Sequence, residues 1–309
     1  MTLSVVLITY NEESNLARTL ESVRPLLHDR QGEIIVVDSG STDRTVEIAK
    51  SFGAKVFVEA WKGYAGQKNS AIEKASGDWI LSLDADEEVD SKFCRVVSRL
   101  ASKPDGLTQT DLTTLAPTSG GDSSDRVEVV TAYEEAVDPG KEEPPDSALG
   151  PSGYRIARKN EFLGRWIKHG GFWPDPKLRL FRRGCGRFEE RAVHETVKVS
   201  GHTATLKHGA ILHRSYPTLS DYIDHMNRYS SLGAEMIATA GPTGFGAINI
   251  VIRPWLTFVY NYFLRLGFLD GREGLLLHAY HAVYVSWKYA KAWELRHSRK
   301  PLRSRPIRD

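Results

Sequence analysis

The chain is poor in cysteine, with two among 309 residues, Cys94 and Cys185. Zinc sites and small disulfide-rich secreted scaffolds need closely spaced pairs of cysteines, so this spacing excludes both classes. We interpret both thiols as reduced and structural. The first residues also lack the basic region, apolar stretch and cleavage site of a secretory signal, so a cytoplasmic location is expected.

No excess of one charge sign is present, because 41 Lys and Arg oppose 39 Asp and Glu, a formal net charge of +2. Binding to a polyanion needs a concentrated basic face, so nucleic acid is not an expected partner. The balance hides an asymmetry. Charges from Pro104 to Gly150 are nearly all acidic, and those from Arg253 onward are mainly basic. A basic, aromatic-rich C-terminus favours an anionic membrane surface as partner.

Strand and helix patterns alternate through the first part of the chain. Such βα units predict an α/β fold of Rossmann-like type, with a mainly parallel sheet and helices on both faces. Ligands of such sheets bind beyond the carboxyl ends of the strands, where Asn11, Asp38 and Asp84 are expected. The expected strands are Leu3 to Ile8, Glu33 to Asp38, Lys55 to Val58 and Trp79 to Leu83, and the helices are Asn15 to Leu27, Thr45 to Phe52 and Gln67 to Ala75.

An acidic segment at about 104–151, rich in Ser, Thr, Gly and Pro, interrupts this pattern. We predict a mobile surface insertion there, with a folded regulatory flap as the alternative. Further strands are expected at Gly153 to Arg158, Leu178 to Arg182 and Ala204 to His208. The texture then becomes helical. We therefore expect an α/β domain at 1–215 and a helical, amphipathic extension at 216–309.

The stretch from Ile248 to Leu269 is apolar enough to resemble a transmembrane segment. Arg253, Pro254, Asn261 and Arg265 interrupt it, and charges inside a bilayer are costly. An interfacial helix is the better interpretation, with peripheral attachment to the cytoplasmic face of the inner membrane. The alternative is packing on the catalytic domain or on a second subunit of a homo-oligomer.

The first predicted strand lacks the glycine-rich motif of dinucleotide-binding proteins, which argues against hydride transfer. Instead, Asp84-Ala85-Asp86 follows the fourth predicted strand. In extended geometry both carboxylates project to the same side, and hard oxygen ligands suit Mg²⁺ or Mn²⁺ on a diphosphate. Alone, the run from Asp84 to Glu88 could equally be a solvated acidic turn.

Four motifs in the first third of the chain occur at strand or helix ends. They are Val6 to Glu12 (VLITYNE), Ile35 to Asp43 (IVVDSGSTD), Gly66 to Ala71 (GQKNSA) and Leu83 to Asp86 (LDAD). In content and order they resemble the inverting family 2 glycosyltransferases of GT-A fold. The resemblance implies an enzyme that takes its sugar from a nucleotide-sugar donor.

The same resemblance implies roles for single residues. Asp38 would accept a hydrogen bond from the base, and Lys68 would approach the diphosphate. Asp86 would bind the metal directly, with Asp84 shared between the ribose and the metal. The alternatives are a helix cap for Asp38 and a surface lysine for Lys68. The full set expected to bind the nucleotide sugar from this part of the chain is Thr9, Tyr10, Asn11, Glu12, Asp38, Lys68 and Asp84.

A second group of motifs resembles a subgroup of that family, the lipopolysaccharide core biosynthesis glucosyltransferases. It comprises Tyr154-Arg155, Phe162 to Gly164, Gly170 to Asp175 (GGFWPD), Arg179 to Arg183 (RLFRR) and Val193 to Glu195 (VHE). An inverting transferase needs a general base beside the acceptor hydroxyl. Carboxylates of these motifs are the candidates.

Glu195 is the leading candidate base and Asp175 the second. His194 is interpreted as a metal ligand or diphosphate contact, or as a buried structural histidine. Arg179 and Arg182 are predicted to share one strand face and neutralise phosphate, with a salt-bridged structural role equally open. Trp173 could stack on an acceptor sugar or simply pack.

These expectations combine into an inverting, Mg²⁺- or Mn²⁺-dependent glycosyltransferase. Its donor would be a UDP-hexose such as UDP-glucose, and its acceptor a lipopolysaccharide core or another lipid-linked glycan. The alternatives are a polyprenyl-phosphate glycosyltransferase and a catalytically silent nucleotide-sugar-binding interaction protein.

Overall fold

The computed structural model of the protein describes residues 2–27, 32–102, 150–189, 196–239, 246 and 248–297. Most of the predicted acidic insertion therefore lies outside the described residues. The predicted site residues His194 and Glu195 lie outside them as well.

A nine-stranded sheet forms the centre of the molecule, in the order β3-β2-β1-β4-β8-β6-β11-β5, with β7 added on β6. The strands β1 to β4 pair in parallel, and β6 pairs in parallel with β11. Because β8 is antiparallel to both β4 and β6, these last two run the same way, and the predicted mainly parallel sheet is confirmed. The bounds are β1 Leu3–Thr9, β2 Glu33–Asp38, β3 Lys55–Val58, β4 Trp79–Ser82, β5 Glu87–Val89, β6 Gly153–Phe162, β7 Arg165–Trp166, β8 Lys177–Arg182 and β11 Thr203–Tyr216.

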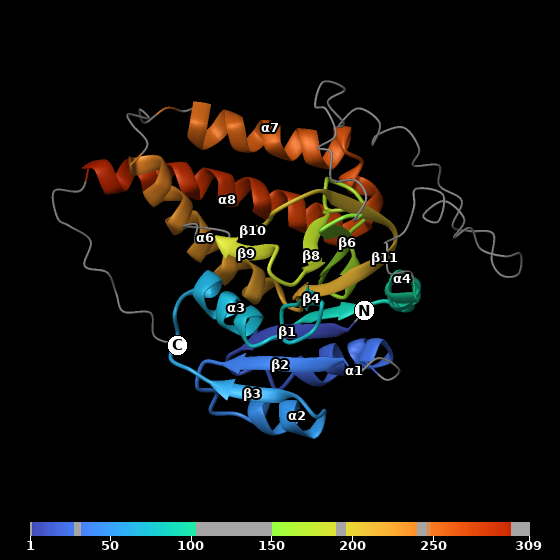
Figure 1. Ribbon diagram of the computed structural model, residues 1–309. Helices are drawn as coiled ribbons and strands as arrows, with labels where there is room; N and C mark the ends of the chain where they lie inside the picture. The colour runs from blue at the N-terminus through green and yellow to red at the C-terminus, as the bar shows by residue number, and fades with distance from the viewer. Residues whose placement is uncertain are drawn as a thin grey trace, which may run out of the picture.

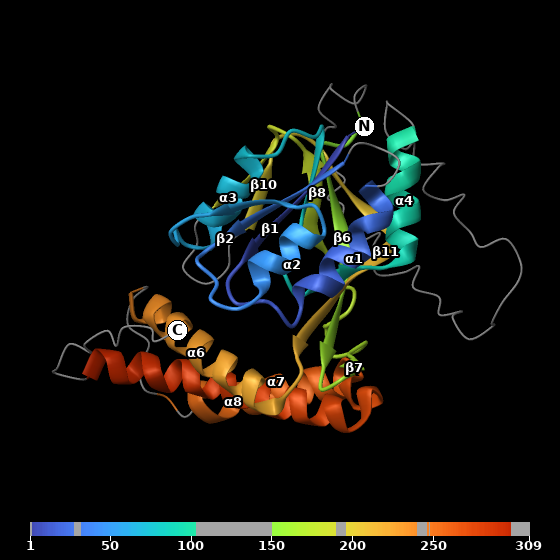
Figure 2. The same ribbon diagram turned by 90° about the horizontal axis from the view of Figure 1, so that it is seen from below.

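Helices cover both faces of the sheet, as predicted (Figures 1 and 2). On one face α1 (Leu16–Leu27), α2 (Thr45–Ser51) and α4 (Ser91–Ser102) enclose one apolar core. On the other face α3 (Tyr64–Glu73) and the hairpin of β9 (Gly186–Glu189) and β10 (Thr196–Val199) enclose a second core. Alternation along β1 divides the two, since Val5 and Leu7 enter the first core and Val6 the second.

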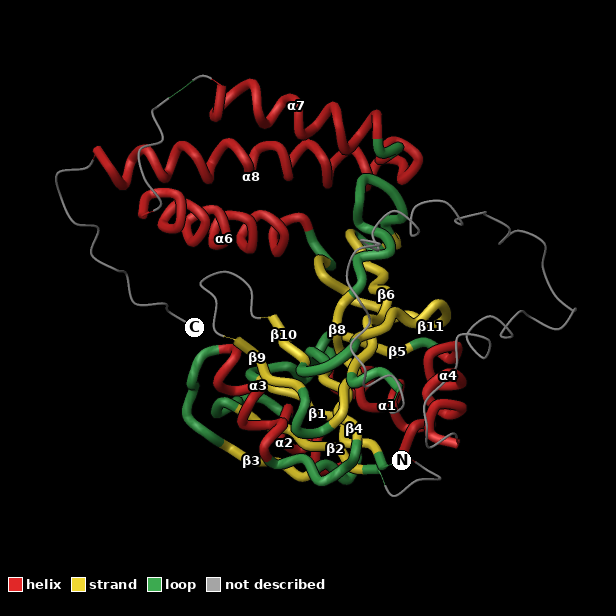
Figure 3. Tube along the Cα trace, turned by 45° about the horizontal axis from the view of Figure 1, so that its top comes forward, coloured by secondary structure: helices red, strands yellow, loops and turns green. Residues whose placement is uncertain are grey.

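The C-terminal helices form a separate layer beside the sheet, as Figures 2 and 3 show. A third apolar cluster joins this layer to the sheet through Phe162, Ile167, Tyr222 and Leu277. The predicted helical extension is thus present, and its packing on the catalytic domain is observed. Within the described ranges no helix combines the length and apolarity needed to cross a bilayer. The helices are α6 (Leu219–Thr239), α7 (Arg253–Val259) with π-helical turns on either side (Ile248–Ile252 and Tyr260–Leu264), a short 3-10 turn (Gly267–Asp270) and α8 (Gly271–His297).

Candidate functional site

The loops that follow β1 and β2 are tied together by Asp38, which is fully buried. Its carboxylate accepts hydrogen bonds from the Thr9 hydroxyl at 2.8 Å, from the backbone N–H groups of Gly40 and Ser41 at 2.9 and 2.8 Å, and from the Ser41 hydroxyl at 2.5 Å. Asp38 therefore organises the turn after β2. Accepting from successive backbone N–H groups is also what a helix-capping carboxylate does, which is the alternative role for this residue. Its predicted contact with a base stays a prediction.

The loop after β1 lies against this turn and beside the two acidic residues that follow β4. Asn11 has a left-handed backbone with φ of 53°, donates from its N–H to the Ser41 hydroxyl and accepts from the Thr42 N–H. Burial raises the pKa of Glu12, and a hydrogen bond from Asn15 lowers it. The negative charges of Asp86, Asp43 and Asp84 raise it further, so the net shift is upward. The predicted Asn11–Glu12 loop and the acidic pair are thus brought together. The Tyr10 ring is exposed beside them.

Asp84 is held between two cations from distant parts of the chain. The Lys68 ammonium of α3 lies 2.7 Å from one carboxylate oxygen, and the Arg179 guanidinium of β8 lies 2.5 Å from the other. Arg179 also donates to the buried Glu87 at 2.8 Å. Burial opposes ionisation of Asp84, but Arg179 and Lys68 outweigh it and hold its pKa well below the usual range. Lys68 is 4% exposed, so the surface-lysine alternative is wrong.

Asp86 meets a histidine that the sequence analysis missed. His213 of β11 places Nε2 3.2 Å from an Asp86 carboxylate oxygen. Its Nδ1 contacts the Asn160 amide oxygen at 3.1 Å and the Ser215 hydroxyl at 2.6 Å. Metal-ligating histidines are commonly fixed through the second ring nitrogen, as Asn160 and Ser215 fix His213 here, and this leaves Nε2 facing the Asp86 carboxylate. The predicted strand ended at His208, so the sequence pattern alone left His213 unplaced.

Asp86 and His213 supply two protein ligands, which suits a metal ion whose remaining ligands come from a bound nucleotide and water. No group of three or more histidine, cysteine, aspartate and glutamate side chains able to hold an ion occurs in the part of the chain that the structure describes. A closed structural zinc site, with four protein ligands, is thus absent from that part. One carboxylate and one imidazole leave positions for phosphate oxygens and water, the usual mode for Mg²⁺ and related ions on nucleotides.

A cavity of about 260 Å³ lies beside His213, between the ends of β6 and β11 and helix α8. Asp175 lies on its wall, where it accepts from Arg158 at 2.8 Å, from Asn160 at 3.1 Å and from Lys177 at 2.8 Å. Burial would raise the pKa of Asp175, but Arg158 and then Lys177 and Asn160 lower it to about 2. A carboxylate so engaged is a weak base. The side chains lining the cavity include Arg158, Asn160, Asp175, His213, Tyr216 and Leu277.

Two other predicted residues have different surroundings. Arg182 pairs with Trp79 at the opposite end of β4, and its guanidinium lies over the Trp79 ring at 5.1 Å. The strand is irregular at Arg179, so simple alternation does not decide whether the two arginines share a face, and that expectation stays a prediction. Trp173 packs edge-on against Trp166 with ring centroids 5.2 Å apart. Its sugar-stacking role stays a prediction.

Comparison with known proteins identifies a family domain in the first third of the chain. Residues 4–112 match the sequence profile described as Glycosyl transferase family 2. The lipopolysaccharide core biosynthesis glycosyltransferase LpsC of Rhizobium meliloti (strain 1021) is 28% identical over 98% of this chain and 95% of its own length.

Two solved structures were also similar. Glucosyl-3-phosphoglycerate synthase from Mycobacterium tuberculosis, with Mn²⁺, UDP and glucosyl-3-phosphoglycerate, is 31% identical over 33% of this chain and 38% of its own, with a TM-score of 0.28. The S. aureus TarS structure in complex with UDP is 14% identical over 96% of this chain and 91% of its own, with a TM-score of 0.42.

The profile match, the similarity to LpsC along almost the whole chain and the acidic site at the carboxyl edge of a mainly parallel sheet agree with one another. Residues 4–112 therefore form a family 2 glycosyltransferase domain, and the chain as a whole is similar to a glycosyltransferase of lipopolysaccharide core biosynthesis.

Proposed function

We propose that the protein transfers a hexose, with inversion, from a nucleotide-diphosphate sugar to a lipopolysaccharide-core or other lipid-linked glycan. UDP-glucose is the first donor to test. The observation that carries the proposal is the pairing of Asp86 with His213 at the edge of a cavity, next to the Lys68–Asp84–Arg179 chain. The similarity to LpsC supports the choice of acceptor.

On the donor side the residues divide into a loop that would hold the nucleoside and a cluster that would face the diphosphate. The buried Asp38 fixes the loop after β2, and the exposed Tyr10 ring can flank a base. Lys68 and Arg179 keep Asp84 ionised and immobile, so that it would meet the ribose or a metal-bound water.

Asp86 and His213 would hold Mg²⁺ or Mn²⁺, with Asn160 and Ser215 fixing the His213 ring. When bound there, the ion would neutralise charge on the departing diphosphate. His194 remains a proposed further ligand or diphosphate contact.

For the general base we propose Glu195 rather than Asp175. Both Asp175 oxygens accept from cationic groups, and its pKa of about 2 gives it little affinity for a proton at neutral pH. The proposed role of Asp175 is to fix Arg158 and Lys177 in the wall of the cavity. Trp173 is proposed to stack on an acceptor sugar.

The test is transfer by the purified protein from UDP-glucose and other nucleotide sugars to a truncated lipopolysaccharide core, with Mg²⁺, Mn²⁺ or EDTA. We expect Asp86→Ala and His213→Ala to lower the rate by at least about 100-fold, since losing a residue that only orients a metal ligand already costs roughly 10–100-fold. His202→Ala removes an exposed histidine away from the site and serves as the control.

Metal-dependent stabilisation by the donor supplies a second readout, because a ligand that binds only the folded protein raises its melting temperature. Donor binding without transfer to any acceptor would favour a silent nucleotide-sugar-binding protein. Transfer to a polyprenyl phosphate alone would favour a carrier-loading enzyme. Full activity of Asp86→Ala in EDTA would refute the metal assignment.

A further inference from the structure

The outward side of α7 and its flanking turns is apolar at helical spacing. Trp255 is 61% exposed and Leu264 is 71% exposed. The outward stripe of a soluble helix is normally polar, and a large exposed apolar patch marks an interaction site. The exposed residues that form this α7 patch are Ile248, Val251, Ile252, Trp255, Leu256, Tyr260, Phe263 and Leu264.

The opposite side of α7 is already occupied by α8. Pro254 is buried, the Ser286 hydroxyl of α8 donates to the Ile250 carbonyl at 2.8 Å, and Arg253 lies over the Tyr289 ring. In Figure 1, α7 forms the outermost layer, on the far side of α8 from the sheet. The α7 patch therefore points away from the rest of the protein.

Within the segment that carries the patch the exposed charges have one sign, and the acidic residue that follows it, Glu273, is paired with Arg165 at 3.4 Å. From Ile248 to Arg272 the exposed charged side chains are Arg253, Arg265 and Arg272, and the acidic residue of that stretch, Asp270, is buried. Basic residues at the rim of an apolar helix favour anionic lipid. A two-fold dimer through the same patch would set one arginine-rimmed surface against an identical one, which offers these arginines no complementary charge and disfavours a second chain as the occupant.

Hydrogen bonds connect the C-terminal end of the patch to the loop that lines the cavity beside His213. The Gly170 N–H donates to the Arg265 carbonyl at 2.9 Å. Buried Asp270 accepts from the backbone N–H groups of Lys168 and His169 at 3.1 and 2.8 Å. The loop held in this way supplies Gly171 to the cavity wall. The turn after α7 thus fixes both the patch and one side of the cavity.

We propose that the α7 patch docks on an anionic lipid bilayer and holds the cavity at the membrane surface, in reach of an acceptor anchored in the same bilayer. The docking surface stands on the patch and its charges alone. The statement about the acceptor rests on the proposed function. The α7 helix would lie in the plane of the interface, with the arginines at the level of the headgroups.

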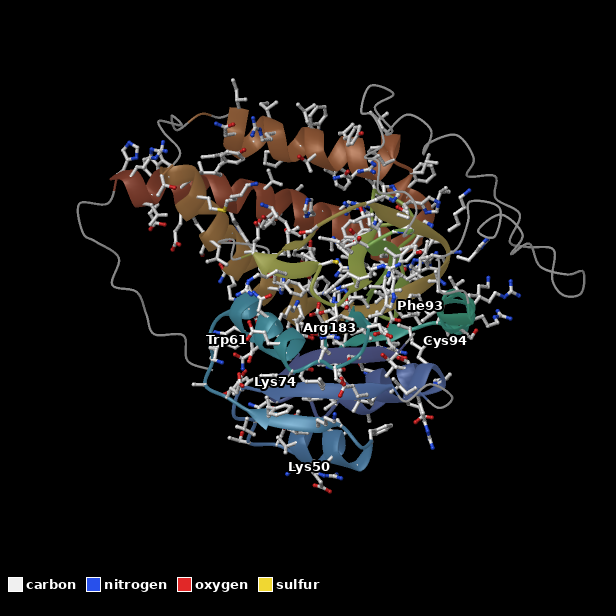
Figure 4. The ribbon with its side chains drawn as sticks, viewed as in Figure 1. Lys50, Trp61, Lys74, Phe93, Cys94 and Arg183 are labelled. Carbon is white, nitrogen blue, oxygen red and sulfur yellow. The ribbon has the colours of Figure 1, made fainter. Side chains whose placement is uncertain are left out.

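Sedimentation of the full chain with vesicles tests the proposal. One set contains phosphatidylglycerol in phosphatidylcholine, and the other contains phosphatidylcholine alone. We expect binding to the anionic vesicles, weakened at least about tenfold by Trp255→Ser combined with Leu264→Ser. The matched control combines Trp61→Ser and Val58→Ser, which are 50% and 65% exposed on the donor side of the molecule, and leaves binding unchanged. Figure 4 shows Trp61 beside α3, away from α7.

Arg272→Gln is expected to weaken binding to the anionic vesicles roughly fivefold and to leave binding to phosphatidylcholine unchanged. Equal binding by the Trp255/Leu264 variant and the native chain would overturn the proposal. So would failure of the native chain to bind anionic vesicles. A native dimer that this variant converts to monomer, without vesicle binding, would assign the patch to a second copy.

Transfer to a delipidated, soluble core oligosaccharide separates the two proposals. The Trp255/Leu264 variant should retain this reaction, because its substitutions lie outside the cavity. Vesicle binding by a chain that transfers no sugar would refute the proposed function and leave the docking surface standing. Transfer to the soluble oligosaccharide by a chain that does not bind vesicles would refute the docking surface and leave the proposed function standing.

Discussion

Asp175 shows how a residue of this site contributes to stability. Its folded pKa of about 2 lies below the ordinary 3.8, because Arg158, Lys177 and Asn160 outweigh the effect of burial. A lowered pKa stabilises the folded state above pH ~4, and this stabilisation is lost as the pH falls toward 2. A shift of this size corresponds to about 2 kcal/mol.

We therefore expect Asp175→Asn to lower the free energy of unfolding by about 2 kcal/mol at pH 7. The difference between the variant and the native protein should shrink to about half by pH 3. Urea unfolding of both proteins at the two pH values measures it. A difference that stays constant with pH would contradict the ion-pair explanation.

Sequence motifs located the residues of the site that are close together in the chain. Asp84, Asp86 and Lys68 lie in short motifs at element ends, and the structure brings them together. His213 and Arg158 could not be found in this way, because strand pairing between β6 and β11 brings them to the site from remote positions. Arg182 shares a motif with Arg179 but lies beside Trp79, whereas Arg179 contacts Asp84, because a short motif does not fix where along the sheet each side chain lies.

At the scale of elements, the predictable strands were those with continuous apolar runs. Glu33–Asp38 and Lys55–Val58 were predicted with the observed bounds. The strand β11 was predicted to end at His208 but continues to Tyr216. The polar stretch around His208 lies within a register shift between Thr205 and Ala210, after which the strand resumes its pairing with β6, and this depends on tertiary structure. Helix α4 was missed altogether.

Gly209 at that register shift allows α4 to approach β11. Its φ is +89°, and a Cβ there would lie 2.5 Å from the Phe93 Cα at the start of α4. Figure 4 shows Phe93 on that helix. The Phe93 Cα is a backbone atom that cannot rotate away, so a side chain at position 209 must displace the backbone. The approach is therefore a requirement of the fold.

Gly209→Ala is expected to cost about 3 kcal/mol or more of stability, from left-handed strain and the backbone clash together. Gly184→Ala, at φ +83° with no atom within 4 Å of the added Cβ, isolates the strain and should cost about 1–2 kcal/mol. Urea midpoints followed by circular dichroism compare them. Equal losses would mean that α4 moves away freely.

At the scale of the whole molecule, the C-terminal helices and the sheet share one cluster and one cavity. Leu277 of α8 packs with Phe162 and Ile167 from the sheet side and with Tyr222 of α6. It also lines the cavity beside His213. The predicted division separates residues 1–215 from residues 216–309 by their order in the sequence. The proposed acceptor site contains residues of both parts, for example His213 and Leu277. Sequence periodicity alone could not predict this shared site, because it indicates which face of a helix is buried but not which element packs against that face.

Leu277→Ala is expected to raise the KM for the acceptor while leaving the affinity for the nucleotide sugar unchanged. The truncation enlarges the cavity wall and should cost about 2–5 kcal/mol of stability, so the kinetics belong at low temperature. The proposed donor residues Asp38, Lys68 and Asp84 are absent from the cavity lining that includes Leu277, so their geometry should persist. Val285→Ala serves as the control, because it is buried in the same helix but absent from the cavity lining. It should destabilise the protein without raising the acceptor KM. A similar rise in both variants would mean that loosening of the helical layer, rather than the wall formed by Leu277, controls the acceptor KM.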